Sequence, residues 1–342
     1  MEDEEVMENQ KEARELYLLG WRTYHDDRKY DEAIKYFNEA AELGDTNSMI
    51  ILGDIYSKGY VVDQDADKAI NYYTKAEKLG NTEATVKTGN MYRNGLAVVE
   101  DKLTALNYYK KAASLGNTEA MCIMATMYRD GEGIKQDKDK AINLLTEAAE
   151  LGDIEAMYNL SETYKYGYSG IEKDFKKSLE WSTKAAETGD DMAMCKLGYI
   201  YKKGEIVKQD LEKALEYFNK LAKKGWTNLM VEVGEMYLNG DDFEKDINKA
   251  IEWFNRAADL GDCSARHELA KIYLEGIGVP KDGQKAIEYI KQNENWREVV
   301  RMYRDGIGVE KNLEEAEKYQ KIIDKEKEKE MERAWQLFYE TN

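Results

Sequence analysis

A tyrosine followed three residues later by glycine recurs at nearly constant intervals along this chain, and no other feature limits the fold as strongly. Successive copies are separated by 36, 36, 36, 37, 36, 36 and 30 residues. The eight tyrosines are Tyr56, Tyr92, Tyr128, Tyr164, Tyr201, Tyr237, Tyr273 and Tyr303. A chain that repeats a unit of this length is expected to stack its repeats in a line, so that each repeat packs on its neighbours.

Each repeat predicts two helices and no strand. The 342 residues include a single proline, which helix interiors exclude, and many residues that helices tolerate well. In the third copy, Met121, Met124, Ala125 and Tyr128 follow the i, i+3, i+4, i+7 spacing of one helix face, and a second stripe of the same kind follows the loop. We therefore predict an all-α fold, an α/α superhelical solenoid of about nine helix-turn-helix repeats.

Small residues occupy one fixed position of the first helix, where they would let the two helices of a repeat approach closely. They are Gly53, Gly89, Ala125, Ser161, Gly198, Gly234 and Ala270. In the first seven repeats a further glycine follows the second helix, where a left-handed C-terminal cap is favoured. Both patterns indicate tightly paired helices.

The loop of the third copy, "YRDGEGIKQDKDKA" at residues 128–141, contains four acids and two glycines, as a cation site or a phosphate loop would. The other copies share its glycine and Asp137 but not Asp130, Glu132 and Asp139 together. The counterparts of Asp137 are Asp65, Asp101, Asp174, Asp210, Asp246, Asp282 and Asn312. Because each precedes the second helix, we interpret it as an N-cap. No metal and no cofactor is predicted.

The charge and the cysteine content limit the classes of partner. A formal net charge of −18 argues against general nucleic-acid binding, which depends on lysine and arginine. The acidic start "MEDEEVMENQ" does not resemble a secretory signal, and no apolar run is long enough to span a membrane. Three distant cysteines indicate no disulfide framework. We expect a cytoplasmic protein without a membrane segment.

Two segments carry a resemblance to a known family. "LGDIYSKGYVVDQDADKAINYYTKAEKLGN" at residues 52–81 and "LAKIYLEGIGVPKDGQKAIEYI" at residues 269–290 resemble the Sel-1-like repeat, a relative of the tetratricopeptide repeat. The likeness covers about residues 46–316. Both families are superhelical scaffolds for protein interaction, so the resemblance implies binding and not catalysis. It says little about the ligand.

The repeats divide the chain into four expected segments. In the first repeat Tyr24 and Ala33 are nine residues apart, where later repeats have thirteen or fourteen, so this repeat looks closer to a tetratricopeptide unit. We expect an acidic, disordered N-terminus at residues 1–10, a tetratricopeptide-like repeat at 11–45, Sel-1-like repeats at 46–312 and a long C-terminal capping helix at 313–342.

Two departures from the repeat lie near the end of the chain. The eighth repeat lacks six residues, which predicts a truncated second helix. In the last helix Met331, Trp335 and Phe338 form a separate apolar stripe. This stripe packs on the preceding helix or docks another chain, which would allow self-association.

The resemblance implies that the first helix of each pair lines a concave groove. The residue after the repeat tyrosine would face this groove, and in four successive repeats it is a cation. The predicted groove residues are these cations, Arg93, Arg129, Lys165 and Lys202, with Val86, Asn90, Cys122, Tyr158, Cys195 and Tyr199 beside them. We predict a groove for a peptide that carries acidic groups or a free carboxylate. The alternative is that the cations pair with acids of neighbouring repeats.

Catalysis is not predicted. His25 and His267 are the only histidines and lie far apart in the sequence. Cysteine-rich relatives are described as β-lactamases or penicillin binders, but they carry a disulfide-linked cysteine pair in each repeat, which this chain lacks. Ser182 and Lys184 do not have the Ser-x-x-Lys spacing. We predict a scaffold or adaptor; the alternatives are a structural or self-associating solenoid and, more remotely, a β-lactamase-like hydrolase.

Overall fold

The structure, a computed structural model, describes residues 2–167 and 170–340, and the side chains of residues 7–167 and 170–335. The described residues form eighteen helices and no strand, so the all-α prediction is confirmed. Consecutive helices pack in nine pairs, one pair for each repeat. The chain divides into two compact units, Met1–Thr188 and Gly189–Asn342, which we describe separately.

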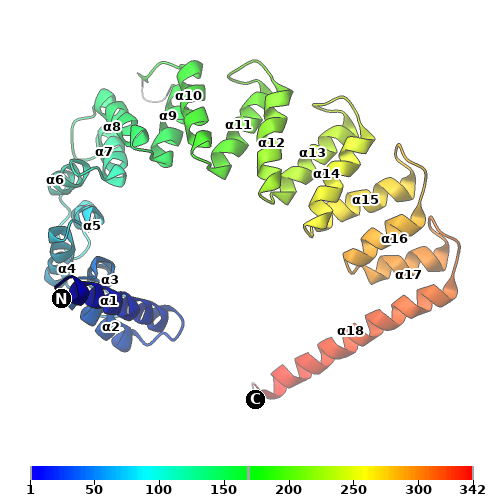
Figure 1. Ribbon diagram of the computed structural model, residues 1–342, viewed down its shortest axis with the longest axis horizontal. Coiled ribbons are helices and arrows are strands. Elements are labelled where there is room, and N and C mark those ends of the chain that lie inside the picture. The colour runs from blue at the N-terminus through cyan, green and yellow to red at the C-terminus, as the bar shows by residue number, and fades with distance from the viewer. Residues whose placement is uncertain (1, 168–169, 341–342) are drawn as a thin grey trace. The chain divides into compact units, whose positions relative to one another are not determined.

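Unit 1 contains five helix pairs. They are α1 (Glu2–His25) and α2 (Tyr30–Glu42), α3 (Thr46–Lys58) and α4 (Ala66–Lys78), α5 (Thr82–Asn94) and α6 (Lys102–Ala113), α7 (Thr118–Asp130) and α8 (Lys138–Glu150), and α9 (Ile154–Tyr166) and α10 (Phe175–Glu187). In this unit α3, α5, α7 and α9 lie on the inner side of a curve, and α4, α6, α8 and α10 lie on its outer side (Figure 1).

Unit 2 contains four pairs. They are α11 (Asp191–Lys203) and α12 (Leu211–Lys223), α13 (Thr227–Asn239) and α14 (Ile247–Asp259), α15 (Cys263–Glu275) and α16 (Gly283–Gln292), and α17 (Trp296–Asp305) and α18 (Leu313–Glu340). The six residues missing from the eighth repeat shorten α16 and α17 to 10 residues each, whereas α14 and α15 have 13. The predicted truncation of the second helix is confirmed, and the following first helix shares it.

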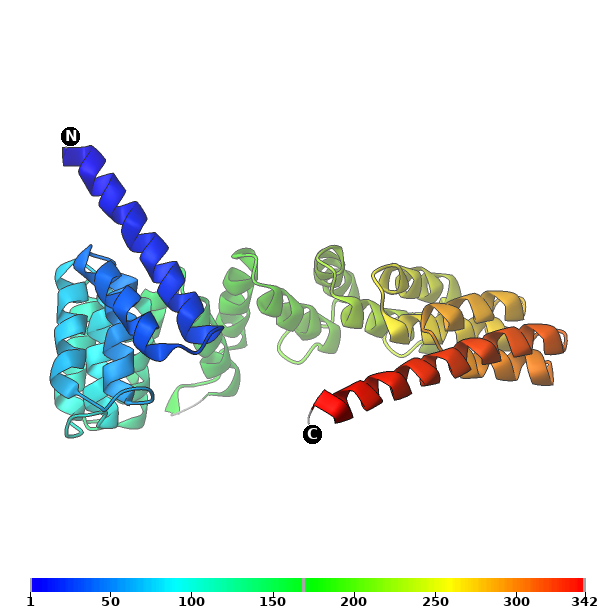
Figure 2. The same cartoon turned by 90° about the horizontal axis from the view of Figure 1, so that it is seen from below.

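The two ends of the chain are helical. Helix α1 begins at Glu2, so residues 2–10, which we expected to be disordered, belong to a helix whose first part extends beyond α2 (Figure 2). Helix α18 begins at Leu313 and packs on α17 through its first turns, where Tyr319 and Ile323 are buried. Its later residues Met331 and Trp335 are exposed, and the side chain of Phe338 lies outside the described residues.

The loop between the two helices of each repeat is held by the residue predicted as the N-cap of the second helix. In the third copy Asp137 Oδ1 accepts the backbone N–H of Lys140 at 3.0 Å, and the backbone N–H of Asp137 donates to the carbonyl of Tyr128 at 2.9 Å. Gly131, with φ of 71°, ends α7 in the left-handed conformation. The bond from the cap residue to the tyrosine carbonyl recurs in all eight copies at 2.8–2.9 Å. The N-cap interpretation is confirmed.

The repeat tyrosine is covered by a lysine from the first turn of the second helix. Lys140 Nζ lies 5.3 Å from the ring centre of Tyr128, and five other copies show the same contact at 4.2–5.1 Å. In several copies the ring also stacks on a tyrosine of the second helix, as Tyr56 does on Tyr72 at 5.9 Å. The tyrosine therefore closes the loop end of each repeat by packing and cation–π contact.

A glycine of the first helix packs directly against an aromatic ring of the second helix in five repeats. A Cβ atom at Gly198 would lie 2.4 Å from Cε1 of Phe218, closer than two carbon atoms can approach. The five pairs are Gly20–Phe37, Gly53–Tyr73, Gly89–Tyr109, Gly198–Phe218 and Gly234–Phe254. At the corresponding positions the fourth, fifth and eighth repeats have Ala125 with Leu145, Ser161 with Ser182 and Ala270 with Ile290.

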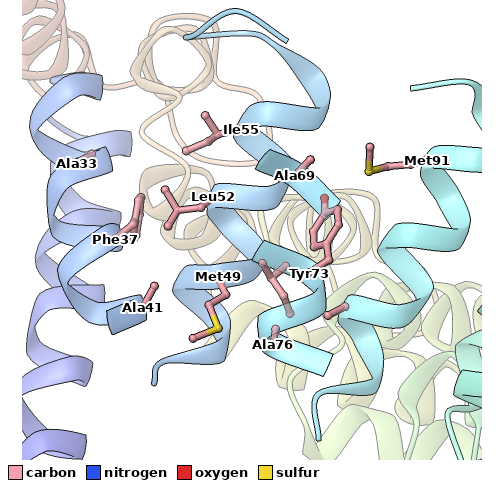
Figure 3. Packing of buried hydrophobic residues seen from close by; sticks show 12 residues of the cluster. Ala33, Phe37, Ala41, Met49, Leu52, Ile55, Ala69, Tyr73, Ala76 and Met91 are labelled. Atoms are coloured by element: carbon pink, nitrogen blue, oxygen red, sulfur yellow. The ribbon is translucent and has the colours of Figure 1, made fainter. Parts of the chain in front are cut away.

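These pairs continue into an apolar core that links successive repeats. Phe37, Leu52, Tyr73 and Met91 come from four successive helices, α2 to α5, and all four are almost fully buried in one cluster (Figure 3). In this cluster side chains are therefore buried between successive repeats as well as within each repeat, and such contacts stabilise a solenoid.

Trp226 takes the position of an N-cap without capping its helix. Its side chain accepts no backbone N–H, but its Nε1 donates to Oδ2 of Asp191, 35 residues earlier, at 3.1 Å. Asn81 and Asn117 donate across the same 35 residues to Thr46 and Thr82. Trp226 thus keeps the hydrogen bond between repeats and gives up the cap.

We predict that substitutions at Gly198 and Phe218 have coupled effects on the free energy of unfolding. Gly198→Ala should lower the free energy of unfolding by about 1–3 kcal/mol because the added methyl group meets the Phe218 ring. Combining it with Phe218→Leu recreates the Ala125–Leu145 pair, so the double variant should lose less than the sum of the single variants, by roughly 0.5–3 kcal/mol. Urea denaturation of the four proteins measures this difference. Strictly additive losses would contradict the contact.

Candidate protein-binding surface

Arg93, the first cation of the predicted groove, is already paired. Its Nε and Nη2 donate to the two carboxylate oxygens of Glu132 at 3.0 and 2.6 Å, and Lys102 Nζ lies 3.6 Å from the same carboxylate. The hydrogen bond from Arg93 lowers the pKa of Glu132. Glu132 belongs to the loop of the following repeat, so Arg93 follows the alternative in which cations pair with acids of neighbouring repeats.

Lys202, in unit 2, is paired in the same manner. Its Nζ lies 3.3 Å from Glu232 and 3.1 Å from Asp242, and only 16% of its side chain is exposed. Tyr199 also donates its hydroxyl to Glu232, and burial together with this acid raises the pKa of Tyr199. Both acids lie in the following repeat. This end of the predicted basic strip is neutralised within the protein.

Arg129 differs from these two cations. Its Nε and Nη2 donate to the adjacent Asp130 at 2.8 Å each, and 47% of its side chain is exposed. Glu132, which binds Arg93, lies 39 residues after it, and the residue 39 positions after Arg129 is Tyr168. Tyr168 is outside the described residues, but it supplies no carboxylate. Among the described residues, the acid that pairs with Arg129 belongs to its own helix end.

Lys165, Asn90 and Tyr158, which were also predicted to line the groove, differ in their contacts. Lys165 is half-buried, with Nζ 5.1 Å from the ring centre of Tyr166. Asn90 is used in the fold, because its Oδ1 accepts the Tyr109 hydroxyl at 2.7 Å. Tyr158 is half-buried on α9.

Val86 does not line a surface. Its side chain is fully buried in a cluster with Leu106, Tyr109 and Met124, so its predicted role in the groove is wrong. At this position of the first helix an apolar side chain can turn into the contact between repeats. Position in the repeat alone therefore does not establish exposure.

Cys122 and Cys195 are half-buried free thiols. Burial raises the pKa of Cys122 to about 12, and Asp153, whose Oδ1 is 3.9 Å from the sulfur, adds to the shift. Burial also raises the pKa of Cys195, with a further contribution from Glu232. Both thiols therefore stay protonated at neutral pH. They are poor nucleophiles and would offer a partner only a small apolar surface.

The predicted residues thus form two sets, one in each unit. Val86, Asn90, Arg93, Cys122, Arg129, Tyr158 and Lys165 belong to unit 1, and Cys195, Tyr199 and Lys202 belong to unit 2. Among the unit 1 residues, Arg129 has a side chain that is 47% exposed and pairs with an exposed acid of its own helix end. It also lines a cavity that sequence reasoning missed.

This cavity lies between α7, α8 and α9 and has a volume of about 90 Å³. Its apolar lining comes from Ala125, Ala141, Ile142, Leu145 and Ile171. Its polar lining comes from Thr126, Asn159 and Thr163, the cations Arg129 and Lys138, and the acid Glu162. An apolar floor with cations beside it can hold an uncharged side chain and an acidic group at the same time.

The preceding repeat explains why the cavity is open. There the position of Leu145 is held by Tyr109, whose ring packs on Gly89 and whose hydroxyl donates to Asn90, the counterpart of Thr126. The counterpart of Thr163 is Met127, which is fully buried. Two smaller side chains therefore leave space that a ring and a thioether fill one repeat earlier. Leu145 at an aromatic position was the sequence signal for this cavity.

Other classes of site are not found in the described part of the chain. No three His, Cys, Asp or Glu side chains there are grouped so as to hold a metal ion. Among the described helices, none is both long enough and apolar enough to cross a membrane.

Comparison with known families decides the relationship that the repeats suggest. A model of the Sel1 repeat matches residues 15–45, 46–81, 82–117, 118–153, 154–190, 191–226, 229–262, 263–292 and 301–319. The chain belongs to the Sel1 repeat family. The first match covers the repeat that we separated as tetratricopeptide-like because of its short loop. Sel1 repeat proteins generally act as scaffolds for protein interaction, and their fold is typically non-enzymatic.

Several solved structures are similar to this Sel1 repeat protein. A Sel1 repeat protein from Oxalobacter formigenes is 26% identical, with a TM-score of 0.47 and 86% of each chain covered. The protective antigen c5321 of uropathogenic Escherichia coli is 24% identical, with a TM-score of 0.39, covering 92% of this chain and 85% of that one. Helicobacter pylori cysteine rich protein B is 25% identical, with a TM-score of 0.30, covering 37% and 90%. No curated protein sequence matches the chain.

We predict slow alkylation of the half-buried thiols. At pH 7.5 iodoacetamide should modify the exposed Cys263 at least tenfold faster than Cys122, because the thiolate is the reactive form and the pKa of Cys122 is raised to about 12. The rate at Cys122 should keep rising, by about tenfold per pH unit, between pH 7 and 10. Peptide mass spectrometry over time measures both rates. Equal rates at pH 7.5 would show that Cys122 is open to solvent.

Proposed function

We propose that this Sel1 repeat protein is an adaptor that binds a segment of a partner protein on the inner side of unit 1, at α7 and α9. The observation that carries the proposal is the combination of an exposed cation, Arg129, with a cavity that it lines. Both occur where the side chains that complete the preceding repeat are replaced by smaller or uncharged ones. The general role of the family in protein interaction supports the same function.

The pairing of the other cations determines where the binding surface is centred. Arg93 and its partner Glu132 are 25% and 24% exposed and joined by two hydrogen bonds, so removing Glu132 would leave a partly buried charge without its partner. Arg129 and Asp130 are about half exposed, and such pairs contribute only about 0–1 kcal/mol. A carboxylate of the partner can replace Asp130 at small cost.

Arginine suits this role because its planar guanidinium donates two parallel hydrogen bonds to one carboxylate. The structure already contains this geometry at Arg93. We expect a partner carboxylate to bind Arg129 through the same two nitrogen atoms, with the rest of the segment lying along the first helices.

Site-specific photo-crosslinking tests the proposal. A benzophenone amino acid at Thr126 or Glu162, on first helices, should crosslink the native partner at least fivefold more than the same group at the exposed Asn107 or Asn143 of the second helices. Arg129→Glu should reduce the crosslink, because it reverses the charge at the centre of the surface. Lys110→Glu, the same charge change on α6, is the control and should not.

Crosslinked products are compared by mass spectrometry in cells that express the protein naturally. Equal crosslinking from the first and second helices, or an Arg129→Glu variant that crosslinks as well as the original chain, would contradict a binding surface on the inner side of unit 1.

A further inference from the structure

We infer that the cavity between α7, α8 and α9 holds one branched aliphatic side chain of the bound segment, while Arg129 and Lys138 bind an acidic side chain of the same segment. This inference deepens the proposed function and rests on it. It commits to a partner peptide that contains Asp or Glu together with Leu, Ile or Val.

The volume of the cavity decides the apolar part of the ligand. An engineered cavity of about 150 Å³ holds a benzene molecule. At about 90 Å³ the present cavity is smaller, so it fits a branched aliphatic side chain better than an aromatic ring. Ile142, Leu145 and the methyl groups of the two alanines would contact this side chain. Burial of an aliphatic side chain contributes roughly 1.5–3 kcal/mol of gross apolar transfer.

The preceding repeat supplies the precedent for the acidic part. There Arg93 and Lys102 both lie within ion-pair distance of Glu132. Gly133, next to this acid, packs on the Lys102 side chain, which holds the loop in place. Arg129 and Lys138 stand at the positions of Arg93 and Lys102, 36 residues later. The second pair thus repeats a carboxylate site whose own glutamate is replaced by Tyr168 in the sequence.

Lys138 forms no ion pair with any described residue. Among the described residues, Asp130 is the acid that pairs with Arg129. Asp130 and Glu162, which also lines the cavity, equal these two cations in number. The preference for an anionic ligand therefore rests on the arrangement of Arg129 and Lys138, which repeats that of Arg93 and Lys102 around Glu132. A glutamate or aspartate side chain is preferred over a free C-terminus because the internal precedent is a glutamate side chain.

Selection from a phage-displayed library of random twelve-residue peptides on the full-length protein tests the inference. The enriched sequences should contain an acidic residue and a branched aliphatic residue at a fixed separation. A fluorescent copy of the best peptide then gives the affinity for each variant. An amidated C-terminus should leave the affinity within about twofold.

Two substitutions remove the two halves of the site. Thr163→Met places in the cavity the residue that the preceding repeat carries at this position, and Arg129→Glu reverses the charge at the rim. Each should weaken binding at least tenfold. Thr163→Val, which keeps the cavity open, and Lys110→Glu, on α6, are the matched controls and should change the affinity less than twofold. Circular dichroism confirms that each variant is folded.

Several outcomes would overturn the inference. They are a library without enrichment, a consensus that lacks the acid or the aliphatic residue, unchanged affinity for Thr163→Met or Arg129→Glu, and loss of binding on amidation, which would indicate a C-terminal carboxylate. Preferential crosslinking from the first helices would still support the proposed function in these cases, so failure of the two claims can be told apart.

Discussion

The contact between a glycine of the first helix and an aromatic ring of the second is the interaction on which the rest of the structure depends. In five repeats it lets the two helices pack closely, and in the first of these the ring also packs in a cluster shared with the next repeat. Where the ring is replaced, the glycine is replaced as well, by alanine or serine. This exchange keeps the helices together, but the side chains no longer fill the same space. The cavity beside Leu145 results from it.

The regular part of the fold could be predicted from the sequence because it depends on local contacts. Asp137 caps the helix that directly follows it, and Gly131 ends the helix directly before it, so both can be recognised from a few neighbouring residues. Gly198 and the small residues at the same position of other repeats could likewise be recognised from the sequence. The helical N-terminus was not predicted, because the acidic composition of residues 1–10 hid a helix that begins at Glu2.

The binding surface could be predicted only in part, because its state depends on residues in the following repeat. Arg93 and Arg129 occupy the same repeat position, yet one is bound by a loop glutamate 39 residues later and the other is not. Val86 and Cys122 also share a position, but Val86 is fully buried and Cys122 is half-buried. Trp226 is an unusual residue for its repeat position, yet it keeps a hydrogen bond between repeats. At the same position of an earlier repeat, Asn117 makes this bond.

Methyl NMR of the protein with a peptide selected for an acidic and an aliphatic residue tests the central claim most directly. The methyl groups of Ile142 and Leu145 line the cavity, whereas Leu106, the counterpart of Ile142, lies one repeat earlier in a cluster that Tyr109 fills. If the cavity holds the ligand, the signals of Ile142 and Leu145 shift on titration and those of Leu106 stay in place. Shifts that leave out Ile142 and Leu145, or that are equally large at Leu106, would contradict the account.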